Sequence, residues 1–445
     1  MDANLRVRAF WDDLRSSLWF RPGVTTLLAV TLAFVATGVD RNGVYPSGYD
    51  LSPDNARSIL STIAGSMLSV VTMTFSIIMV VLVLASQQFS PRILRNFIRD
   101  QTSQNILSIF IGTFVYCLLV MLRISDNGKD IFVPVWAVLI AIALALISMA
   151  ALVYFIDHIA KQTRVSYILA EINRQTVSVM RKARKERSRY AASEDETAPA
   201  PDAPREAVRI YSQRVGYVQA IDFAEIVRLA SDADLTVQLL RAVGDFVSVH
   251  GDFLLAWPAD HLPDGLDEKL YALFDIGPER TLMEDQLLGM QQLVDIALKA
   301  MSPSVNDPNT AVNCIHYMTN LLIQAAESPD LPMYYKDEEG EIRVICHQSS
   351  FEAMVDLAFS QLRHYAAGDM VVMARMLEAL YEIALGTTGH ARLEVLWRHA
   401  RLIVRTIATQ ETDALARQRI NTIIKRLARQ VGQAAETIML NVHVN

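Results

Sequence analysis

Four runs of the sequence contain no Asp, Glu, Lys or Arg, and they constrain the fold more than any other feature. They cover residues 22–39, 58–91, 101–122 and 131–156, with lengths of 18, 34, 22 and 26 residues. A helix needs about 20 apolar residues to cross a bilayer core of about 30 Å. Three runs reach this length, and the first reaches it if Trp19 and Phe20 lie at the interface. We therefore expect four transmembrane helices rather than buried helices of a soluble core.

The composition indicates a chain of two parts. Hydrophobic residues make up 52 % of the 445 residues and charged residues 20 %, which excludes a disordered chain and a disulfide scaffold. Residues 1–164 carry 13 Lys and Arg against 10 Asp and Glu, a net charge of +3. Residues 165–445 carry 28 against 38, a net charge of −10. A membrane domain over residues 1–160 followed by an acidic region outside the bilayer fits this division.

The positions of Lys and Arg predict the orientation of the spans. Sixteen of these residues flank the spans on the side of the N-terminus, and four lie in the loops on the other side. Because cytoplasmic loops carry the excess of positive charge, we expect both termini on the cytoplasmic side of the plasma membrane. Asp12 and Asp13 argue against a cleaved signal peptide. Cys117, Cys314 and Cys346 all lie outside the predicted external loops, so no disulfide is expected.

The segment between the second and third spans has the pattern of a short basic amphipathic helix. Ser90 can cap this helix and Pro91 suits its first position. Its apolar face suits the cytoplasmic headgroup surface, and the alternative is a helical turn packed on the soluble part. In either case it can couple two spans to the cytoplasmic region. The candidate coupling residues are Ser90, Pro91, Arg92, Arg95, Phe97 and Arg99.

Two long motifs resemble a known family. The first is Ala-Ser-Gln-Gln-Phe-Ser-Pro-Arg-Ile-Leu-Arg-Asn-Phe at residues 85–97, and the second is Ala-Leu-Lys-Ala-Met-Ser-Pro-Ser-Val-Asn-Asp-Pro-Asn-Thr-Ala at residues 297–311. Together with residues 56–68 and 112–117, they are similar to the uncharacterised bacterial membrane family called domain of unknown function 2254. The resemblance covers nearly the whole chain and implies a bacterial plasma-membrane protein with four spans. It implies no established biochemical activity, so the chemistry must be argued from residues.

The second span carries a stripe of hydroxyl groups on one side of the predicted helix. The stripe could line a water-filled path in a homo-oligomer, with hydroxyls replacing part of an ion's hydration. Alternatively, small and hydroxyl side chains pack helix against helix. The four charge-free runs contain no acidic or basic residue, which argues against an ion-coupled pump more than against a passive channel. The pore-lining candidates are Ser58, Thr62, Ser66, Ser69, Ser76 and Gln87.

The fold class predicted for the remainder is a cytoplasmic α+β region. A juxtamembrane basic helix and a flexible linker are expected over residues 161–206, and seven Lys and Arg between Arg174 and Arg189 suit anionic lipid headgroups better than nucleic acid. A small β-rich unit is expected over residues 207–276, with strands at 207–212, 215–221, 235–240 and 245–249 and a helix capped by Asp222.

A helical domain is expected over residues 277–445. A helix over 284–301 ends before Ser302-Pro303, and Asp307 caps a new helix that begins at Pro308. This turn is either an anion-binding turn at a helix N-terminus, with Ser302, Asn306, Asp307 and Thr310 as candidates, or a simple helix–turn–helix joint. Further helices are expected over residues 351–366, 369–385, 390–408 and 413–432.

Catalysis has little support in the sequence. The chain has no Gly-rich phosphate loop, no His-Glu-x-x-His and no Gly-x-Ser-x-Gly, and its nine histidines are scattered. We expect no enzyme, no metal and no cofactor. Two functions are open: a homo-oligomeric channel or channel-like transporter gated by the cytoplasmic domain, and a membrane-anchored sensor or interaction scaffold without transport activity.

Overall fold

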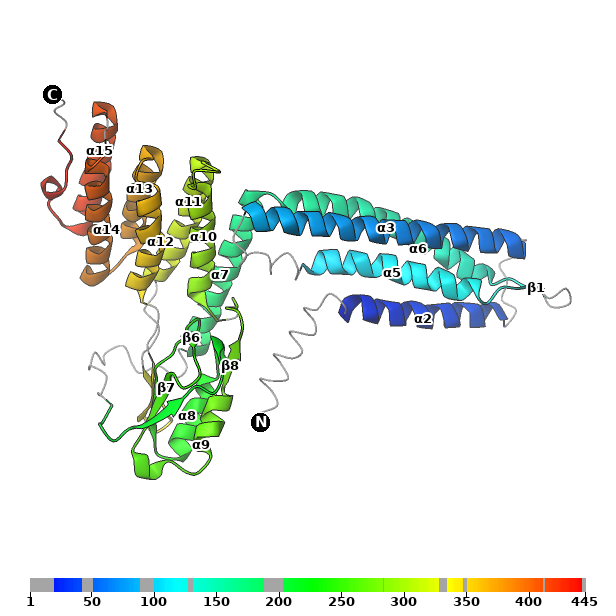
Figure 1. Ribbon diagram of the computed structural model, residues 1–445, viewed down its shortest axis with the longest axis horizontal. Coiled ribbons are helices and arrows are strands. Elements are labelled where there is room, and N and C mark those ends of the chain that lie inside the picture. The colour runs from blue at the N-terminus through cyan, green and yellow to red at the C-terminus, as the bar shows by residue number, and fades with distance from the viewer. Residues whose placement is uncertain are drawn as a thin grey trace. The chain divides into compact units, whose positions relative to one another are not determined.

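The computed structural model (Figure 1) describes residues 20–41, 51–88, 100–126, 131–187, 203–282, 284–327, 334–346, 350–410 and 413–441. The chain divides into two compact units, with the boundary between Tyr167 and Ile168. Most of the predicted coupling segment, with Ser90, Pro91, Arg92, Arg95, Phe97 and Arg99, lies outside the described residues.

The first unit consists of helices and one short hairpin. The helices are α2 (Phe20–Arg41), α3 (Pro53–Gln88), α5 (Gln101–Met121) and α6 (Val135–Gln162), and the hairpin is β1 (Ser125–Asp126) with β2 (Ile131–Phe132). Each helix is long and apolar enough to cross a membrane, which confirms four candidate spans at the predicted places. Helix α5 contacts α2, α3 and α6, and it is the most buried of the four.

Small and hydroxyl residues hold α5 against its neighbours. A Cβ atom at Gly112 would lie 3.0 Å from Thr25 Cγ2, so α2 and α5 pack closely. Thr113 Oγ1 lies 3.1 Å from Ser148 Oγ on α6, and both side chains are buried. Tyr116, also buried, donates a hydrogen bond to the Ala137 carbonyl at 3.0 Å. These bonds satisfy polar groups that would be costly in lipid.

The second unit begins in α7 (Val165–Arg187) and continues into two small sheets. The five-stranded sheet has the order β3-β7-β5-β10-β9, and the three-stranded sheet has the order β6-β4-β8. Helix α8 contacts β5 and β10, and α9 contacts β8. The elements are β3 (Val208–Tyr211), β4 (Gly216–Ile221), α8 (Phe223–Asp232), β5 (Thr236–Leu239), β6 (Phe246–Val247), β7 (Asp252–Trp257), η1 (Ala259–His261), α9 (Leu266–Ala272), β8 (Phe274–Gly277), β9 (Tyr334–Lys336) and β10 (Ile342–Cys346).

The strand predictions hold for the first part of this region and fail for the rest. Strands β3, β4, β5 and β6 lie within the predicted segments, and Asp222 caps α8 as expected. Strands β7 to β10 were not predicted. Strand β10 pairs in parallel with β5, with Val344 opposite Val237, although the two are more than 100 residues apart. A five-residue strand between long helices is stabilised by its distant partner, which local sequence does not reveal.

The remaining helices form three stacked hairpins. They are α10 (Gln286–Ala300), α11 (Pro308–Ala326), α12 (Phe351–Tyr365), α13 (Met370–Gly386), α14 (His390–Ala408) and α15 (Ala414–Val431), followed by η2 (Ala435–Thr437). Helices α10, α12 and α14 contact one another in one layer, and α11, α13 and α15 do so in the other (Figure 1). The helix boundaries agree with the sequence prediction to within about two residues, as helix ends usually do.

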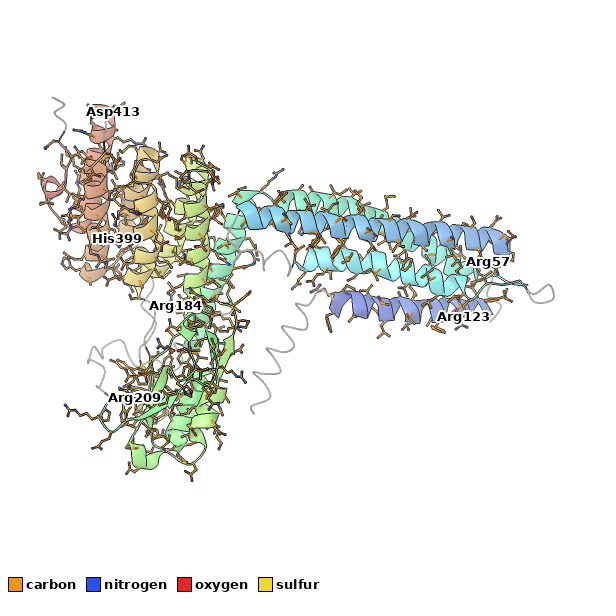
Figure 2. The ribbon with its side chains drawn as sticks, in the orientation of Figure 1. Arg57, Arg123, Arg184, Arg209, His399 and Asp413 are labelled. Carbon is orange, nitrogen blue, oxygen red and sulfur yellow. The ribbon has the colours of Figure 1, made fainter. Side chains whose placement is uncertain are left out.

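The hairpins stack in parallel register. Arg363 and Asp356 of α12 bond to Thr406 and His399 of α14, and both pairs are separated by 43 residues. Arg419 of α15 pairs with Glu378 of α13 in the same sense. The turns α10–α11, α12–α13 and α14–α15 therefore lie along one edge of the stack, which we call the turn edge. Figure 2 labels Asp413 at the end of α15 that belongs to this edge.

Candidate functional site

Helix α3 has two opposite faces of different chemistry. Its buried residues Ala56, Leu60, Ala64, Met67 and Thr74 pack toward the other helices of the first unit. At 100° per residue, the predicted stripe is centred about 160° from this buried face. Its described members Ser58, Thr62, Ser66, Ser69 and Ser76 are all exposed. Packing against the other described helices of the first unit therefore does not account for the stripe.

Four hydroxyls along the stripe are bonded to their own helix. Thr62, Ser66, Ser69 and Ser76 donate to carbonyl oxygens four residues earlier at 2.8 to 3.1 Å. Such bonds let hydroxyls sit in an apolar helix without an unsatisfied donor. The oxygen lone pairs stay available as acceptors, so the face offers neutral oxygen ligands and no charge.

The structure adds two members to this face. Thr72 is exposed and donates to the Leu68 carbonyl at 3.0 Å, and Gly65 is exposed with nothing within 4 Å of a Cβ at that position. On the helical wheel, both positions lie just outside the arc that defined the predicted stripe. We call Ser58, Thr62, Gly65, Ser66, Ser69, Thr72 and Ser76 the hydroxyl face. It extends over about 27 Å at 1.5 Å per residue, close to the thickness of a bilayer core. Gln87 falls within α3, but its side chain lies outside the described residues.

The outer surfaces of α2 and α6 differ from the hydroxyl face. On α2, Leu27, Leu28 and Phe34 are 67, 64 and 53 % exposed, and on α6, Leu146 and Val153 are 68 and 65 % exposed. Large apolar side chains of this kind suit contact with lipid tails. The hydroxyl face is richer in hydroxyls than these surfaces, although Met73 and Val80, which are 56 and 58 % exposed, lie on the same side of α3.

A polar cluster ties α5 to α6 at one end of the bundle. Asp100 caps α5 by accepting a hydrogen bond from Ser103 N at 2.8 Å, and its Oδ2 lies 3.0 Å from His158 Nε2. Burial by itself would raise the pKa of Asp100, but the hydrogen bonds from Ser103 and His158 hold this pKa below its ordinary value. The cluster lies next to the predicted coupling segment in the sequence.

At the other end of the bundle, Asp40 of α2 caps α6. The sequence did not single out this residue. The side chain is fully buried and accepts hydrogen bonds from Trp136 N at 3.1 Å and Ala137 N at 3.2 Å. A carboxylate at these positions satisfies free N–H groups at the start of α6 and opposes the helix dipole. Because Asp40 lies on α2, the cap acts between helices, which a local sequence pattern cannot indicate.

The turn from Ser302 to Thr310 has a carboxylate of its own. Asp307 accepts from Thr310 N at 3.1 Å and from Thr310 Oγ1 at 2.6 Å, and these bonds lower the pKa of Asp307. Ser302 Oγ donates to the Lys299 carbonyl at 2.7 Å, and Asn306 has a left-handed backbone with φ of 47°. The negative charge at the N-terminus of α11 favours a helix–turn–helix joint over an anion site.

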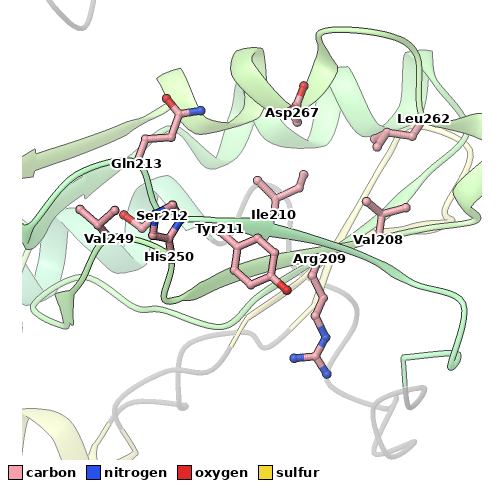
Figure 3. A pocket seen from close by; sticks show the side chains of 10 residues that line it. All are labelled: Val208, Arg209, Ile210, Tyr211, Ser212, Gln213, Val249, His250, Leu262 and Asp267. Atoms are coloured by element: carbon pink, nitrogen blue, oxygen red, sulfur yellow. The ribbon is translucent and has the colours of Figure 1, made fainter.

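A cavity of about 460 Å³ runs along the edge strand β3 (Figure 3). Ile210 points to the side of Leu262 and Asp267, whereas Arg209 and Tyr211 point the other way. Arg209 is paired with Asp252 at 3.0 Å. The polar lining groups do not converge on one point, and the described ranges hold no group of three His, Cys, Asp or Glu side chains that could bind a metal ion.

Comparison with known proteins is consistent with this membrane architecture. The uncharacterised proteins Rv1290c of Mycobacterium tuberculosis and Mb1321c of Mycobacterium bovis are each 29 % identical over 422 residues, which covers 92 % of this chain and 79 % of the relative. No solved structure matches the chain. Residues 15–382 match the model of one family, so the chain belongs to the family described as predicted membrane protein DUF2254.

Proposed function

We propose that this membrane protein is a homo-oligomeric channel or channel-like transporter whose path is lined by the hydroxyl face of α3. One observation carries the proposal: the hydroxyl face points away from the protein's own bundle and is exposed. In a closed oligomer, each copy would place this face toward a common axis. The apolar outer surfaces of α2 and α6 would then meet lipid.

The chemistry of the face supports passive conduction. Rings of hydroxyl oxygens would replace part of the hydration of a small ion or bind water and small neutral solutes. A coupled pump normally carries an ionisable residue in its transport path. The hydroxyl face has none, and the buried Asp40 is engaged by two backbone N–H groups.

The second unit follows the last span directly in the sequence, and in this proposal it gates the path. Helix α6 ends at Gln162 and α7 begins at Val165, so only two residues separate a span from the helix in which the second unit begins. The Asp100–His158 contact joins α5 to the end of α6 near the same point in the chain. In this proposal both termini are cytoplasmic, as the Lys and Arg distribution predicts, and the basic residues of α7 meet anionic headgroups of the plasma membrane.

The second candidate is a membrane-anchored sensor or interaction scaffold without transport. Gly65 and the neighbouring hydroxyls would allow two copies of α3 to pack closely and without water. The stacked helical hairpins would then supply a binding surface, as in other helical repeat proteins.

Flux through liposomes that contain the purified protein separates the two candidates. We expect flux of small ions or solutes, and its loss when Ser66→Leu and Ser69→Leu are introduced together, because two bulky apolar side chains would fill the path. The matched control is Val153→Leu on α6, which is 65 % exposed and outside the hydroxyl face. A protein that passes no ion or solute under voltage or pressure would leave only the scaffold.

A further inference from the structure

Positive charge in the second unit is concentrated in two segments, α7 and the last hairpin. Residues 390–431, which contain α14 and α15, carry nine Lys and Arg against three Asp and Glu, a net charge of +6. The other residues of 165–445 carry a net charge of −16. Helix α7 (residues 165–187) has six Lys and Arg against two Asp and Glu, a net charge of +4, so everything outside α7 and the last hairpin carries −20.

Four of the nine basic residues are used within the unit. Arg398 pairs with Glu352 and Asp356, and Arg419 pairs with Glu378. Arg392 and Arg417 donate to backbone carbonyls. The other five are exposed, with no ion pair or hydrogen bond to any described residue: Arg401 and Arg405 lie in the half of α14 nearer the turn edge, and Lys425, Arg426 and Arg429 lie in the half of α15 farther from it. Together we call these five residues the basic hairpin surface.

The turn edge, to which Arg405 belongs, exposes large apolar side chains. Leu415, in the first turn of α15, is 77 % exposed, and Val371 and Tyr365 at the α12–α13 turn are 60 and 58 % exposed. Parallel stacking of the hairpins places these residues along one edge, with Arg405 in the last turn of α14 at the same edge. Exposed apolar side chains beside unpaired arginines are typical of surfaces that lie in a bilayer interface.

We infer that the basic hairpin surface and the adjoining turn edge dock on anionic phospholipid. The charge is complementary to phosphatidylglycerol-type headgroups, and the apolar side chains of the turn edge can enter the acyl boundary. Between α7 and this hairpin the unit is acidic and is repelled by the same headgroups, so the hairpin is, besides α7, the part of the unit whose charge favours approach to the bilayer. The four candidate spans belong to the same chain, which keeps the lipid surface at a high effective concentration. The inference does not depend on transport activity.

A fluorophore attached at Leu415→Cys tests this contact in the full-length protein. The native cysteines Cys117, Cys314 and Cys346 are buried, so an environment-sensitive thiol dye labels the introduced site selectively. The labelled protein is placed at one copy per lipid nanodisc, with phosphatidylcholine alone or with added phosphatidylglycerol. The control is Leu385→Cys, which is 55 % exposed at the other end of α13, away from the turn edge.

We expect the dye at 415 to shift to shorter wavelength and to be quenched by nitroxide-labelled lipid only in anionic discs. This signal should be lost in salt of about 1 M, where the screening length is about 3 Å. It should also be lost in the triple variant Arg401→Gln, Arg405→Gln, Lys425→Gln. The triple variant Arg209→Gln, Arg214→Gln, Lys269→Gln removes three exposed basic residues from the sheet region and should keep the signal.

Two outcomes would overturn the inference. One is a dye at 415 that behaves like the dye at 385 in both lipids. The other is a signal that is absent at one copy per disc and appears in either lipid when two copies share a disc, because the surface would then bind an acidic region of a second copy. Neither outcome bears on flux, so the proposed function is tested separately.

Discussion

Gly289 lets α7 lie directly on α10. A Cβ atom at this position would overlap the side chain of Thr176, which is fully buried and donates to the Ile172 carbonyl. Protein interiors cannot absorb an added methyl group where two helices already touch. Gly289 lies at the end of the first turn of α10, where its lack of a side chain is explained by this packing.

Gly289→Ala should destabilise the second unit by about 1–3 kcal/mol through overpacking. Thermal unfolding of the purified full-length protein would show this as a lower Tm. Adding Thr176→Gly to Gly289→Ala removes the overlapping side chain and should recover part of the loss. Gly368→Ala is the control, since a Cβ there meets nothing within 4 Å. Purely additive effects of the two substitutions would contradict the contact.

His399 is a buried titratable group between two hairpins. It is 1 % exposed, and its Nε2 lies 2.7 Å from Asp356 Oδ1. Burial lowers the pKa of His399, and the nearby Asp356 carboxylate only partly opposes this effect. The neutral imidazole is therefore the form that the folded stack accommodates.

The stability of the helical stack should fall as the pH drops below about 6.5, the ordinary pKa of histidine. In this range the unfolded chain binds a proton at residue 399 and the folded chain does not, so the free energy of unfolding decreases. Tm measured between pH 8 and 5 should depend less on pH in His399→Gln than in the parent. His390→Gln, at a side chain that is 79 % exposed, should not change the slope. Equal slopes in all three proteins would show that His399 titrates normally.

At the scale of elements, the helices and their caps were predictable because their signals are local. Asp222 and Asp307 stand directly before the helices they cap, and the four spans were visible as charge-free runs. The cap of α6 by Asp40 and the pairing of β10 with β5 depend on residues far apart in the sequence. The hydroxyl stripe on α3 was predictable as a pattern, but only the fold shows that it faces outward.

Asp307→Ala should lower the stability of the second unit by about 1 kcal/mol, the usual cost of losing a helix N-cap. Asp369 caps α13 in the same way, accepting from Val372 N at 3.0 Å, and Asp369→Ala should cost a similar amount. Urea unfolding of both variants measures these losses. Phosphate should stabilise neither parent nor variants. Specific stabilisation of the parent by phosphate that is lost in Thr310→Val would instead support an anion site at the turn.

At the scale of the molecule, two surfaces have no role in the folded monomer. The hydroxyl face lies on the first unit and the basic hairpin surface on the second. The hydroxyl face lies on the outside of a helix bundle, and the basic hairpin surface lies on the last hairpin of a stack. Terminal repeats of stacked proteins usually carry polar outer faces that cap the core. In the inferred docking, the net charge of +6 on the terminal hairpin does more than keep the stack soluble, because it attracts this hairpin to an anionic membrane.

A cysteine at Gly65 tests whether α3 meets α3 between copies. Position 65 lies on the hydroxyl face with open space around it, so Gly65→Cys should fold, and its thiol should be accessible. If copies assemble through this face, a bifunctional thiol reagent applied to native membranes should join chains through Gly65→Cys. Leu28→Cys on α2, at a position that is 64 % exposed, should stay monomeric on a denaturing gel. Equal and low cross-linking at both positions would mean that the hydroxyl face meets lipid, and the oligomeric channel would be excluded. Cross-linking without liposome flux would favour the scaffold, because the same contact would then be dry packing between helices.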